Sequence, residues 1–458
     1  MARTRMVVVG GDAAGMSAAS QARRGRPASE LEIVAFERGP HTSYSACGLP
    51  YYTAGLVGDW HDLVVRSPAE FARAGIDARV RHEVEAIDLR AARVTVTDLA
   101  TGRTAAHAFD VLVLATGARP LRPPIPGIDL PGVHGLQILQ DGLDLRAAVD
   151  ARPARAVVIG GGYIGLEAAE ALVQRGVPTA LVEQAPEVMG TLDPDMGALV
   201  SQALRDVGVE LHLGEEVEAI EGDGAVRAVR TSARTLDADL VVLGLGTAPA
   251  VELAQAAGIR LGQTGAVVTD ARMATPHPGI WAAGDCAETR HLVSGQPANF
   301  HLGSIANKQG RVCGTNIGGG RATFPGVLGT AASRICAVEV ARTGLSEAEL
   351  GGLGLAYETV TLDSTTVAGY LPDAPSIRTK VIAERGSGRL LGAQIVGGPG
   401  SAKRIDVFAT ALTCGMSVDA VASLDLSYAP PFGPVWDPVL IAARKLAERQ
   451  AVSRPNSS

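Results

Sequence analysis

Two stretches of the chain share one pattern of hydrophobic and small residues. The first, "MVVVGGDAAGMSAASQARRG", begins at Met6, and the second, "ARAVVIGGGYIGLEAAEALVQRG", begins at Ala154. In each stretch a continuous apolar run predicts a strand buried on both faces, and an alanine-rich segment after a glycine turn predicts a helix. A second apolar run then ends in an acid, Glu37 in "LEIVAFE" and Glu183 in "TALVE". The pattern therefore predicts an internal repeat of strand, turn, helix and strand.

The second turn carries the complete G-x-G-x-x-G pattern, at Gly160, Gly162 and Gly165. A turn of this kind between a strand and a helix binds the pyrophosphate of a dinucleotide at the helix N-terminus. Glu183 follows at the place where an acid accepts hydrogen bonds from the adenosine ribose. Because an acid would repel the 2′-phosphate of NADPH, we expect NADH as the electron donor and keep NADPH as the alternative.

The first turn departs from this pattern at one position. Gly10 and Gly15 occupy the outer fingerprint positions, but Asp12 stands where the middle glycine belongs. A carboxylate there would repel a pyrophosphate unless it points away or serves another purpose. The alternative interpretation of this stretch is a tight turn in an α/β fold that binds no nucleotide.

Further strands are expected outside the two repeats. From residue 81, alternating apolar and polar residues predict an antiparallel meander that returns to the buried strand "VLVLATG", which ends at Thr116 and Gly117. Near residue 280, "IWAAGD" predicts a strand that ends in Asp285. This acid would hold the ribityl chain of a flavin, unless it is an ordinary helix N-cap. Two nucleotide units in one chain indicate a nicotinamide that hands a hydride to a flavin.

Composition narrows the class of protein. The length of 458 residues predicts about two to four domains, and 55 glycines with only 4% aromatic residues favour α/β packing over a sandwich or barrel. A net charge of −7 argues against nucleic-acid and membrane partners, which require basic surfaces. No apolar run of about 18 residues predicts a membrane span. The cysteines show no metal or disulfide spacing, so we expect no metal site and a cytoplasmic location.

One of the five cysteines, Cys47, lies among small residues in "TSYSACGLPYY". A free cysteine is more often an inert small hydrophobe than a nucleophile, because its reactivity depends on its surroundings. This stretch alone therefore assigns no chemistry. The two nucleotide units change the interpretation, since they would bring electrons to a redox thiol.

Four motifs carry a family resemblance: "GGDAAG", "ATGARP", "GGGYIGLE" and "IWAAGD", in that order. At these spacings the sequence resembles the flavoprotein disulfide reductases, the pyridine nucleotide-disulfide oxidoreductase family. The resemblance implies an α/β fold with two Rossmann-like domains, for FAD and NAD, and an α+β C-terminal dimerisation domain. The expected segments are a discontinuous FAD-binding domain at 1–120 and 255–325, an NAD(P)H-binding domain at 121–254, the dimerisation domain at 326–450 and a disordered tail at 451–458.

The resemblance also implies cofactor-binding positions. Those that match FAD contacts are Gly10, Gly11, Ala14, Gly15, Glu37, Arg38, Ser45, Val84, Ala115, Thr116, Gly117, Gly284, Asp285 and Ala306. Those that match NAD contacts are Gly160, Gly162, Tyr163, Ile164, Gly165, Glu183 and Gly246. Tyr163 matches the aromatic residue that covers the flavin and swings aside for the nicotinamide, and a core tyrosine is the alternative.

Many members of this family use two cysteines five positions apart, and here the second position is Tyr52. Cys47 would therefore act as a single redox thiol. The pattern resembles the single-cysteine branch, which contains coenzyme A disulfide reductases, NADH oxidases and NADH peroxidases. Oxidases and peroxidases commonly carry a histidine where this chain has Ala13, which removes the acid/base group expected for peroxide chemistry. Beside a flavin and near a helix start, the Cys47 thiol is expected to have a lowered pKa.

Substrate positions follow from the same resemblance. Those that match coenzyme A contacts are Ser17, Gln21, Arg24 and Ser43. Arg24 would bind a phosphate, with solvated helix surface as the alternative. Lys403 and Arg404 would either meet substrate phosphates or be surface charges.

Two C-terminal segments, "VAGYLPDA" and "LSYAPPFGPVWDP", resemble the tyrosine motifs of the coenzyme A disulfide reductases. The resemblance implies a homodimer with shared active sites, in which Tyr370 and Tyr428 lie over Cys47 of the other subunit. A phenol there would protonate a departing thiolate. The first motif departs from the family at Val367 and Leu371, and a ring packed in a rigid turn is the alternative for Tyr428.

The expected function is that of an FAD-dependent NAD(P)H:disulfide oxidoreductase. Its substrate would be coenzyme A disulfide or a similar small disulfide, attacked by Cys47. An NADH oxidase that reduces oxygen and a persulfide or polysulfide reductase are alternatives. A flavin-dependent redox sensor that binds a partner is the alternative outside the enzymes.

Overall fold

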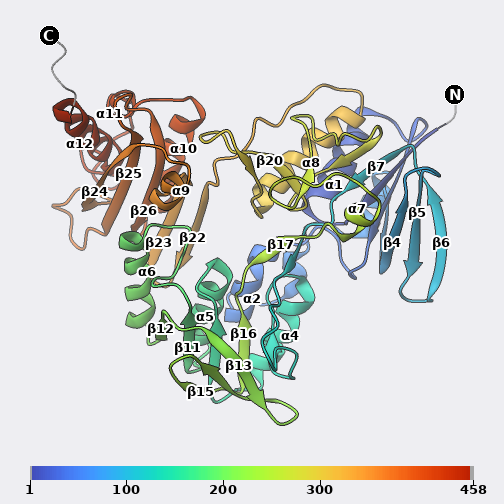
Figure 1. Ribbon diagram of the computed structural model, residues 1–458, viewed down its shortest axis with the longest axis horizontal. Coiled ribbons are helices and arrows are strands. Elements are labelled where there is room, and N and C mark those ends of the chain that lie inside the picture. The colour runs from blue at the N-terminus through green and yellow to red at the C-terminus, as the bar shows by residue number, and fades with distance from the viewer. Residues whose placement is uncertain (1–2, 454–458) are drawn as a thin grey trace.

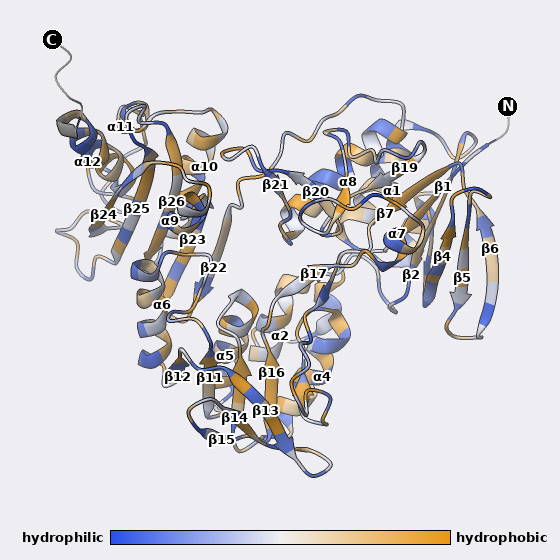
Figure 2. Ribbon diagram, viewed as in Figure 1, coloured by the Kyte–Doolittle hydropathy of each residue, from blue (hydrophilic) through white to orange (hydrophobic). Residues whose placement is uncertain are grey.

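The computed structural model describes residues 3–453 of the chain. Figure 1 shows three lobes: the N-terminal segment shares a lobe with the segment around α8, the central segment forms a second lobe, and the C-terminal segment forms a third. Hydrophobic residues concentrate on the central strands of the lobes (Figure 2). The predicted α/β class with Rossmann-like parallel sheets is confirmed.

The first lobe contains a parallel five-stranded sheet in the order β19-β7-β1-β2-β3. Its strands are β1 (Thr4–Val9), β2 (Leu31–Glu37), β3 (Asp77–Val80), β7 (Val111–Leu114) and β19 (Ile280–Ala282), and its main helices are α1 (Ala13–Gly25) and α8 (Gly303–Ile317). Val7 and Val8 in the central strand are fully buried, as the continuous apolar run predicts.

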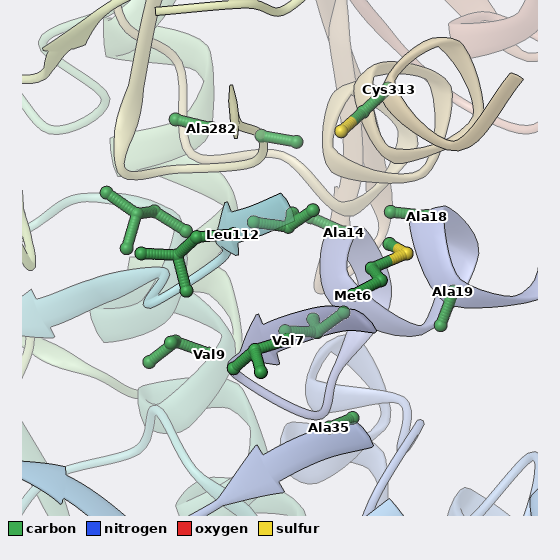
Figure 3. Packing of buried hydrophobic residues seen from close by; sticks show 14 of the residues in the cluster. Met6, Val7, Val9, Ala14, Ala18, Ala19, Ala35, Leu112, Ala282 and Cys313 are labelled. Carbon is green, nitrogen blue, oxygen red and sulfur yellow. The ribbon is translucent and has the colours of Figure 1, made fainter. Parts of the chain in front are cut away.

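Helices α1 and α8 pack closely because α8 carries glycines at the contact. A Cβ at Gly310 would lie 2.2 Å from the carbonyl oxygen of Ala14, and a Cβ at Gly314 would lie 2.2 Å from that of Ala18. No side chain fits such distances, so the two helix backbones approach directly. Figure 3 shows the resulting core of small side chains from α1 and α8 around Met6.

Smaller elements complete the first lobe. The predicted meander is confirmed as an antiparallel sheet of β4 (His82–Asp88), β5 (Arg93–Asp98) and β6 (Arg103–Ala108). The other short elements are α3 (Pro68–Arg73), α7 (Glu252–Ala256), β18 (Val267–Val268), β20 (Ala287–Arg290) and β21 (Pro297–Ala298).

The second lobe repeats this plan with the sheet order β12-β11-β10-β16-β9, again parallel. Its strands are β9 (Val133–His134), β10 (Ala156–Ile159), β11 (Thr179–Glu183), β12 (Glu210–Leu213) and β16 (Leu240–Leu243). Its helices are α4 (Leu139–Asp150), α5 (Tyr163–Gln174) and α6 (Pro194–Asp206), and its meander is β13 (Val217–Gly222), β14 (Val226–Thr231) and β15 (Thr235–Asp237). The predicted internal repeat is therefore visible strand by strand.

The first two lobes meet at a two-stranded ribbon and at the Cys47 stretch. The ribbon pairs β8 (Ala118–Pro120) with β17 (Thr247–Pro249), and the Cys47 stretch forms η1 (Ala46–Gly48) and α2 (Leu49–Ala54), followed by η2 (Trp60–Leu63). Leu49 is fully buried in the core of the second lobe, and a Cβ at Gly142 would lie 2.7 Å from its Cδ2. Cys47 is thus held between the two nucleotide units.

The third lobe is an antiparallel sheet in the order β22-β23-β26-β25-β24. Its strands are β22 (Ala331–Ile335), β23 (Val338–Gly344), β24 (Tyr357–Thr365), β25 (Ser376–Glu384) and β26 (Leu390–Gly397). Its helices are α9 (Glu347–Gly352), η3 (Ala402–Arg404), α10 (Ile405–Thr413), α11 (Val418–Ala422) and α12 (Pro438–Ser453).

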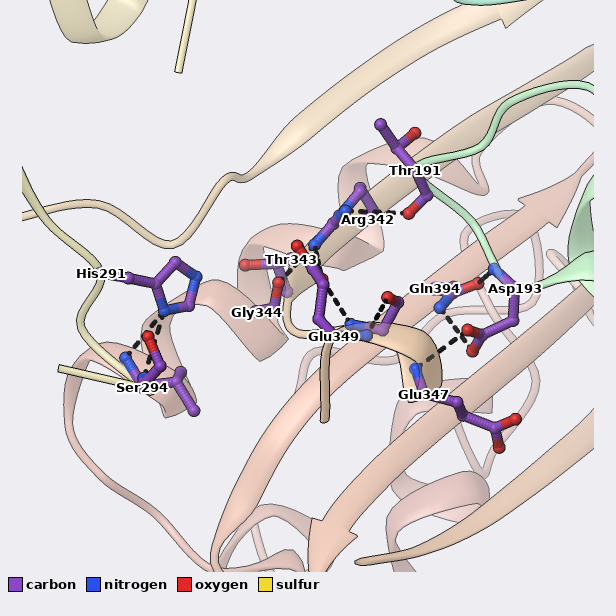
Figure 4. A network of polar contacts seen from close by, with 12 residues as sticks. Thr191, Asp193, His291, Ser294, Arg342, Thr343, Gly344, Glu347, Glu349 and Gln394 are labelled. Carbon is purple, nitrogen blue, oxygen red and sulfur yellow. Dashed lines mark hydrogen bonds and ion pairs between the residues drawn. The ribbon is translucent and has the colours of Figure 1, made fainter. Parts of the chain in front are cut away.

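A buried polar network joins the second and third lobes (Figure 4). Lys380 Nζ in β25 lies 3.1 Å from Asp193 Oδ2, and Gln394 Nε2 donates to the same oxygen at 2.8 Å. Arg342 Nη1 in β23 donates to the carbonyl oxygen of Thr191 at 2.9 Å. These contacts fix the segment before α6 against the third lobe.

Helix α12 ends at Ser453, so its last residues overlap the stretch 451–458 that the sequence analysis expects to be a disordered tail. The remainder of that expected tail, 454–458, lies outside the described residues. The limits of the three domains stay a prediction. Within residues 3–453, no helix is long and apolar enough to cross a membrane, and no group of His, Cys, Asp and Glu is arranged to hold a metal ion.

Candidate active site

The two glycine turns have nearly the same geometry. Gly10 and Gly160 adopt φ values of 109° and 101°, a left-handed region that favours glycine. A Cβ at Gly15 would lie 2.0 Å from the carbonyl oxygen of Gly10, and a Cβ at Gly165 would lie 1.9 Å from that of Gly160. Only glycine permits this approach of helix to strand, and the first turns of α1 and α5 therefore point their N–H groups out of the sheet edge.

The predicted ribose acids occupy equivalent places. Glu37 Oε2 accepts a hydrogen bond from the Gly11 N–H at 2.8 Å, and Glu183 Oε2 accepts one from the Gly161 N–H at 2.6 Å. The second oxygen of Glu183 accepts from the Ala185 N–H at 2.8 Å. Both carboxylates are thereby held at the carboxyl end of their sheets, where they fit the adenosine ribose of a bound dinucleotide.

The predicted flavin residues from distant segments converge at Gly284. A Cβ at this glycine would lie 2.8 Å from the Cβ of Ala14 and 3.6 Å from that of Ala306. Burial alone raises the pKa of the neighbouring Asp285 carboxyl to about 6. No cation among the described residues offsets this effect, so the Asp285 carboxyl fits a ligand that donates hydroxyl groups to it, as the ribityl chain of FAD does.

Further residues predicted to contact the cofactors lie in the turns that follow β7 and β16. Gly117 and Gly246 have φ values of 71° and 85°, and Thr116 Oγ1 donates to the carbonyl oxygen of Ala250 at 2.5 Å, which ties the two nucleotide units together. The other predicted cofactor positions are Ala115 directly after β7, Arg38 directly after β2, Ser45 before η1, Val84 buried in β4 and Ile164 in the first turn of α5.

Tyr163, which the resemblance implies as the residue that covers the flavin, begins α5. Burial raises the pKa of its phenol, and the Thr191 hydroxyl offsets part of that effect. The Tyr163 hydroxyl is buried, and no side chain among the described residues makes a well-formed hydrogen bond to it. Leaving a buried hydroxyl without a partner costs about 1–3 kcal/mol.

Cys47 lies in the single turn of η1 with its side chain open to solvent. The Ser45 N–H donates to the carbonyl oxygen of Leu63 at 2.8 Å, and the Gly48 N–H donates to that of Ser45 at 2.9 Å, which fixes the loop. The expected lowering of the thiol pKa is wrong for the chain by itself. Burial and then the charge of Glu167 raise the pKa of the Cys47 thiol, against the lowering effect of its own backbone N–H.

A cavity of about 470 Å³ opens beside α1. It is lined by three of the predicted substrate residues, Ser17, Arg24 and Ser43, together with Asp12. Ser43 has a φ of 48°, a strained conformation for serine, and strain of this kind is typical of functional loops. Gln21 does not line this cavity: its Oε1 accepts hydrogen bonds from Arg24 and it faces a neighbouring groove.

The two predicted catalytic tyrosines lie in the third lobe. Tyr370 and Tyr428 are 74% and 48% exposed and hydrogen-bond to each other, and neither lines the cavity beside α1 in its own chain. Arg404 holds both of their loops, since its Nη2 donates to the carbonyl oxygens of Thr366 at 2.8 Å and Phe432 at 2.9 Å. Its guanidinium therefore has a structural role and is not a free phosphate ligand.

Comparisons with known proteins agree with this geometry. Residues 4–310 match the family model described as pyridine nucleotide-disulphide oxidoreductase, and residues 330–438 match the dimerisation domain of that family. The chain belongs to this family. The resemblance inferred from the four motifs is confirmed, and the protein is an FAD-dependent NAD(P)H oxidoreductase. The dimerisation domain supports a homodimer.

Three similar proteins illustrate the range of the family. A protein of Pyrococcus horikoshii named NAD(P)H coenzyme A polysulfide/persulfide reductase is 37% identical over 97% of this chain and 98% of its own. A protein of Methanocaldococcus jannaschii named NADH oxidase is 34% identical over 96% of this chain and 98% of its own. The reduced CoADR-RHD structure of Bacillus anthracis has a TM-score of 0.95 and 35% identity, covering 99% of this chain and 81% of its own.

The structure adds residues that the sequence did not single out. Glu167 in α5 is the charged group with the largest effect on the pKa of Cys47, and its Oε1 accepts a hydrogen bond from Ser333 Oγ at 2.6 Å. Asn307 and Arg311 in α8 line the cavity beside α1. A sequence signal existed only for Glu167, which is part of the motif "GGGYIGLE".

Proposed function

We propose that the enzyme reduces the sulfur–sulfur bond of coenzyme A disulfide, or of a similar small disulfide, through the single thiol of Cys47. Two features together carry this proposal. Cys47 is exposed at the junction of the two nucleotide units, and the cavity beside α1 is lined by the hydroxyls of Ser17 and Ser43 and by Arg24. No second cysteine stands five positions after Cys47, where Tyr52 is found, so the partner sulfur must come from the substrate.

The residues of this chain have separate tasks in the reaction. Arg24 supplies a cation for a substrate phosphate, and Ser17 and Ser43 supply hydroxyls along the cavity. The Cys47 thiolate attacks one substrate sulfur, forms a mixed disulfide and releases the other half of the substrate as a thiolate. FAD, when bound, supplies the two electrons from NAD(P)H that reduce the mixed disulfide.

The second subunit completes the site in this proposal. Tyr370 and Tyr428 point their phenols into solvent and hydrogen-bond to each other, which suits residues that are covered by another copy of the chain. Phe432, Val435 and Trp436 beside them are 79%, 68% and 51% exposed, an apolar group that a monomer would rarely leave uncovered.

NADH is the proposed electron donor. The Glu183 side chain accepts hydrogen bonds from the N–H groups of Gly161 and Ala185, and this fixed orientation supports a ribose-binding role. A 2′-phosphate would meet this carboxylate at close range. The ratio of kcat/KM for NADH and NADPH tests this preference, and a value at or below one would contradict it.

A persulfide or polysulfide is the second candidate substrate. The name of the 37% identical Pyrococcus horikoshii relative favours it, since that protein is called a coenzyme A polysulfide/persulfide reductase. Both substrates present a sulfane or disulfide sulfur to the same thiol. The ratio of kcat/KM for coenzyme A persulfide and coenzyme A disulfide separates them, and stoichiometric oxygen uptake without either substrate would favour an NADH oxidase.

Replacing Cys47 with serine tests the proposal. The Cys47→Ser variant should lose NADH-dependent disulfide reduction down to the background rate while retaining its flavin, because the thiol is the only nucleophile assigned to the substrate. Cys414→Ser is the matched control, since Cys414 is also exposed but lies at the end of α10. Disulfide turnover in the Cys47→Ser variant at the rate of the control would exclude the mechanism.

A further inference from the structure

A row of side-chain hydrogen bonds crosses from the ribbon between the first two lobes to the segment that carries Asp285. It begins at Thr247, the first residue of β17, whose Oγ1 lies 2.5 Å from His301 Nδ1. His301 Nε2 lies 2.7 Å from Asn299 Oδ1. Asn299 Nδ2 donates to the carbonyl oxygens of Asp285 at 2.9 Å and Ala287 at 3.0 Å. Thr247, His301 and Asn299 thus form an interlobe relay.

The contacts of Asn299 fix the position of the proton on the His301 ring. Carbonyl oxygens only accept hydrogen bonds, so the amide nitrogen of Asn299 faces the two carbonyls and its Oδ1 is left for His301. Because Oδ1 is an acceptor, His301 Nε2 carries the hydrogen and donates it. Burial lowers the pKa of His301, which favours the neutral ring. In that ring Nδ1 accepts, so the Thr247 hydroxyl donates to it.

The two ends of the interlobe relay lie beside residues predicted to contact different cofactors. Thr247 directly follows Gly246, a predicted NAD contact with a φ of 85°. Asp285, whose carbonyl oxygen accepts from Asn299, is a predicted FAD contact. One imidazole therefore connects the turn expected to contact NAD with the segment expected to contact FAD.

The relay adds a contact of a different kind to this junction. The Leu121 N–H donates to the Gly246 carbonyl oxygen at 2.9 Å, which joins the two connecting segments to each other. A two-stranded connection between lobes can bend as a unit, because a few residues at its ends absorb the change. His301 lies just before α8 in the first lobe, so its bond to Thr247 holds the connection against that lobe.

A second histidine of the first lobe shows the ordinary local role against which His301 is judged. His291 Nδ1 accepts hydrogen bonds from the N–H groups of Val293 and Ser294 at 3.2 and 3.3 Å, two and three residues further along the chain. That ring stabilises its own loop. Both ring nitrogens of His301 instead contact side chains, and one of these, on Thr247, is 54 residues away in the sequence.

We propose that His301 is a positioning residue for hydride transfer, which holds the turn at Gly246 and Thr247 so that the nicotinamide meets the flavin. FAD, when bound, accepts the hydride with its two electrons from NAD(P)H. A misplacement of about 1 Å can cost roughly a hundredfold in rate, so a contact between the two nucleotide units bears directly on this step. Flavin reduction precedes the reaction with any acceptor, and the inference therefore does not depend on the sulfur substrate proposed above.

The Thr247→Val substitution tests the relay, because it removes the hydroxyl and keeps the shape of the side chain. Mixed rapidly with saturating NAD(P)H, the variant holoenzyme should lose its flavin absorbance roughly tenfold more slowly than the wild type. The NAD(P)H concentration that gives half the limiting rate should change by less than about threefold, since the relay positions the cofactor and does not bind it. Thr247→Ser, which keeps the hydroxyl, should recover most of the rate.

Arg119→Met is the matched control on the same ribbon. Arg119 in β8 contacts Glu252, and the two side chains are 52% and 62% exposed. An exposed ion pair of this kind contributes little, so the control should be reduced at the wild-type rate.

Two further measurements separate positioning from damage to the fold. His301→Phe keeps an aromatic ring but neither nitrogen, and adding Thr247→Val to it should slow flavin reduction no further, because both changes remove the same contact. In the holoenzyme without NAD(P)H, hydrogen–deuterium exchange should be faster in residues 244–250 of Thr247→Val than in the wild type, and unchanged in β1.

Three outcomes overturn the inference. Equal limiting rates of flavin reduction in the wild type and Thr247→Val would show that the relay does not position the cofactors. Weaker binding of NAD(P)H at an unchanged limiting rate would make Thr247 a binding contact instead. Purification of Thr247→Val without its flavin would assign the relay to retention of FAD, and the ratio of flavin to protein absorbance identifies that case.

Discussion

At the scale of single residues, the surroundings of Cys47 decide its chemistry. The motif around it predicts a redox thiol, but the chain by itself raises the pKa of that thiol through the surrounding protein and Glu167. The protein groups around Cys47 thus favour its thiol form over its thiolate form. Cys47 therefore differs from cysteines whose thiolate is stabilised by a helix N-terminus before any ligand binds.

This environment predicts slow alkylation of Cys47 in the chain stripped of FAD. Because its pKa is raised, a smaller fraction is thiolate at any given pH, and only the thiolate reacts. The rate of iodoacetamide labelling should stay low at neutral pH and climb through the range above the ordinary cysteine pKa. Mass spectrometry of the peptide that contains residue 47 measures the rate, with Cys47→Ser as background. A rate already at its maximum at neutral pH would contradict the assignment.

At the scale of elements, two equivalent turns have been assigned different nucleotides. Gly15 and Gly165 have the same contact, in which a Cβ would lie 2.0 or 1.9 Å from a carbonyl oxygen of the preceding turn. The middle position differs, with Asp12 in one turn and Gly162 in the other. Substituting the equivalent glycine in each turn can therefore show which nucleotide each unit binds.

The substitutions Gly15→Ala and Gly165→Ala should weaken the binding of different cofactors. Each forces a helix away from its turn at a cost of about 1–3 kcal/mol. Gly15→Ala should be purified with less flavin, whereas Gly165→Ala should keep its flavin and show a KM for NADH about tenfold higher or more. Flavin absorbance and steady-state kinetics measure the two effects. Equal loss of flavin in both variants would show that the turns are not assigned correctly.

At the scale of the whole molecule, Lys380 joins the second and third lobes. Its Nζ lies 3.1 Å from Asp193 and 2.8 Å from Asp195, while Lys380 and Asp193 are only 3% and 2% exposed. The Asp193 carboxylate also accepts hydrogen bonds from the Glu347 N–H and from Gln394. The network holds the nucleotide-binding lobe in place against the lobe that carries the dimerisation domain.

Removing the Lys380 cation should therefore destabilise the fold strongly. The Lys380→Met variant leaves the buried Asp193 without a counter-charge, at a cost of about 3–5 kcal/mol. Arg378→Met is the control on the same strand, because its partner Asp363 is 69% exposed and such a pair contributes under about 1 kcal/mol. Urea denaturation followed by fluorescence gives both midpoints. Similar midpoints for the two variants would contradict the role of the network.

Much of this protein was determined by local sequence. The glycines at Gly10 and Gly160 are required by a left-handed φ, and the valines of β1 by burial on both faces, so pattern and fold coincide there. Glu37 and Glu183 occupy equivalent positions because each ends the second strand of its repeat. The same local logic predicted the family and its cofactors, because a dinucleotide fingerprint is contained in one strand, one turn and one helix.

Tertiary structure decided what local patterns do not contain. The raised pKa of Cys47, the separation of Gln21 from the other predicted substrate residues and the structural use of Arg404 depend on neighbours that are distant in sequence. The cavity that Asp12 lines exists because α1, α8 and the Ser43 loop meet there. Electrostatics and cavity shape are sums over contacts between segments, so they become defined only when the chain has folded.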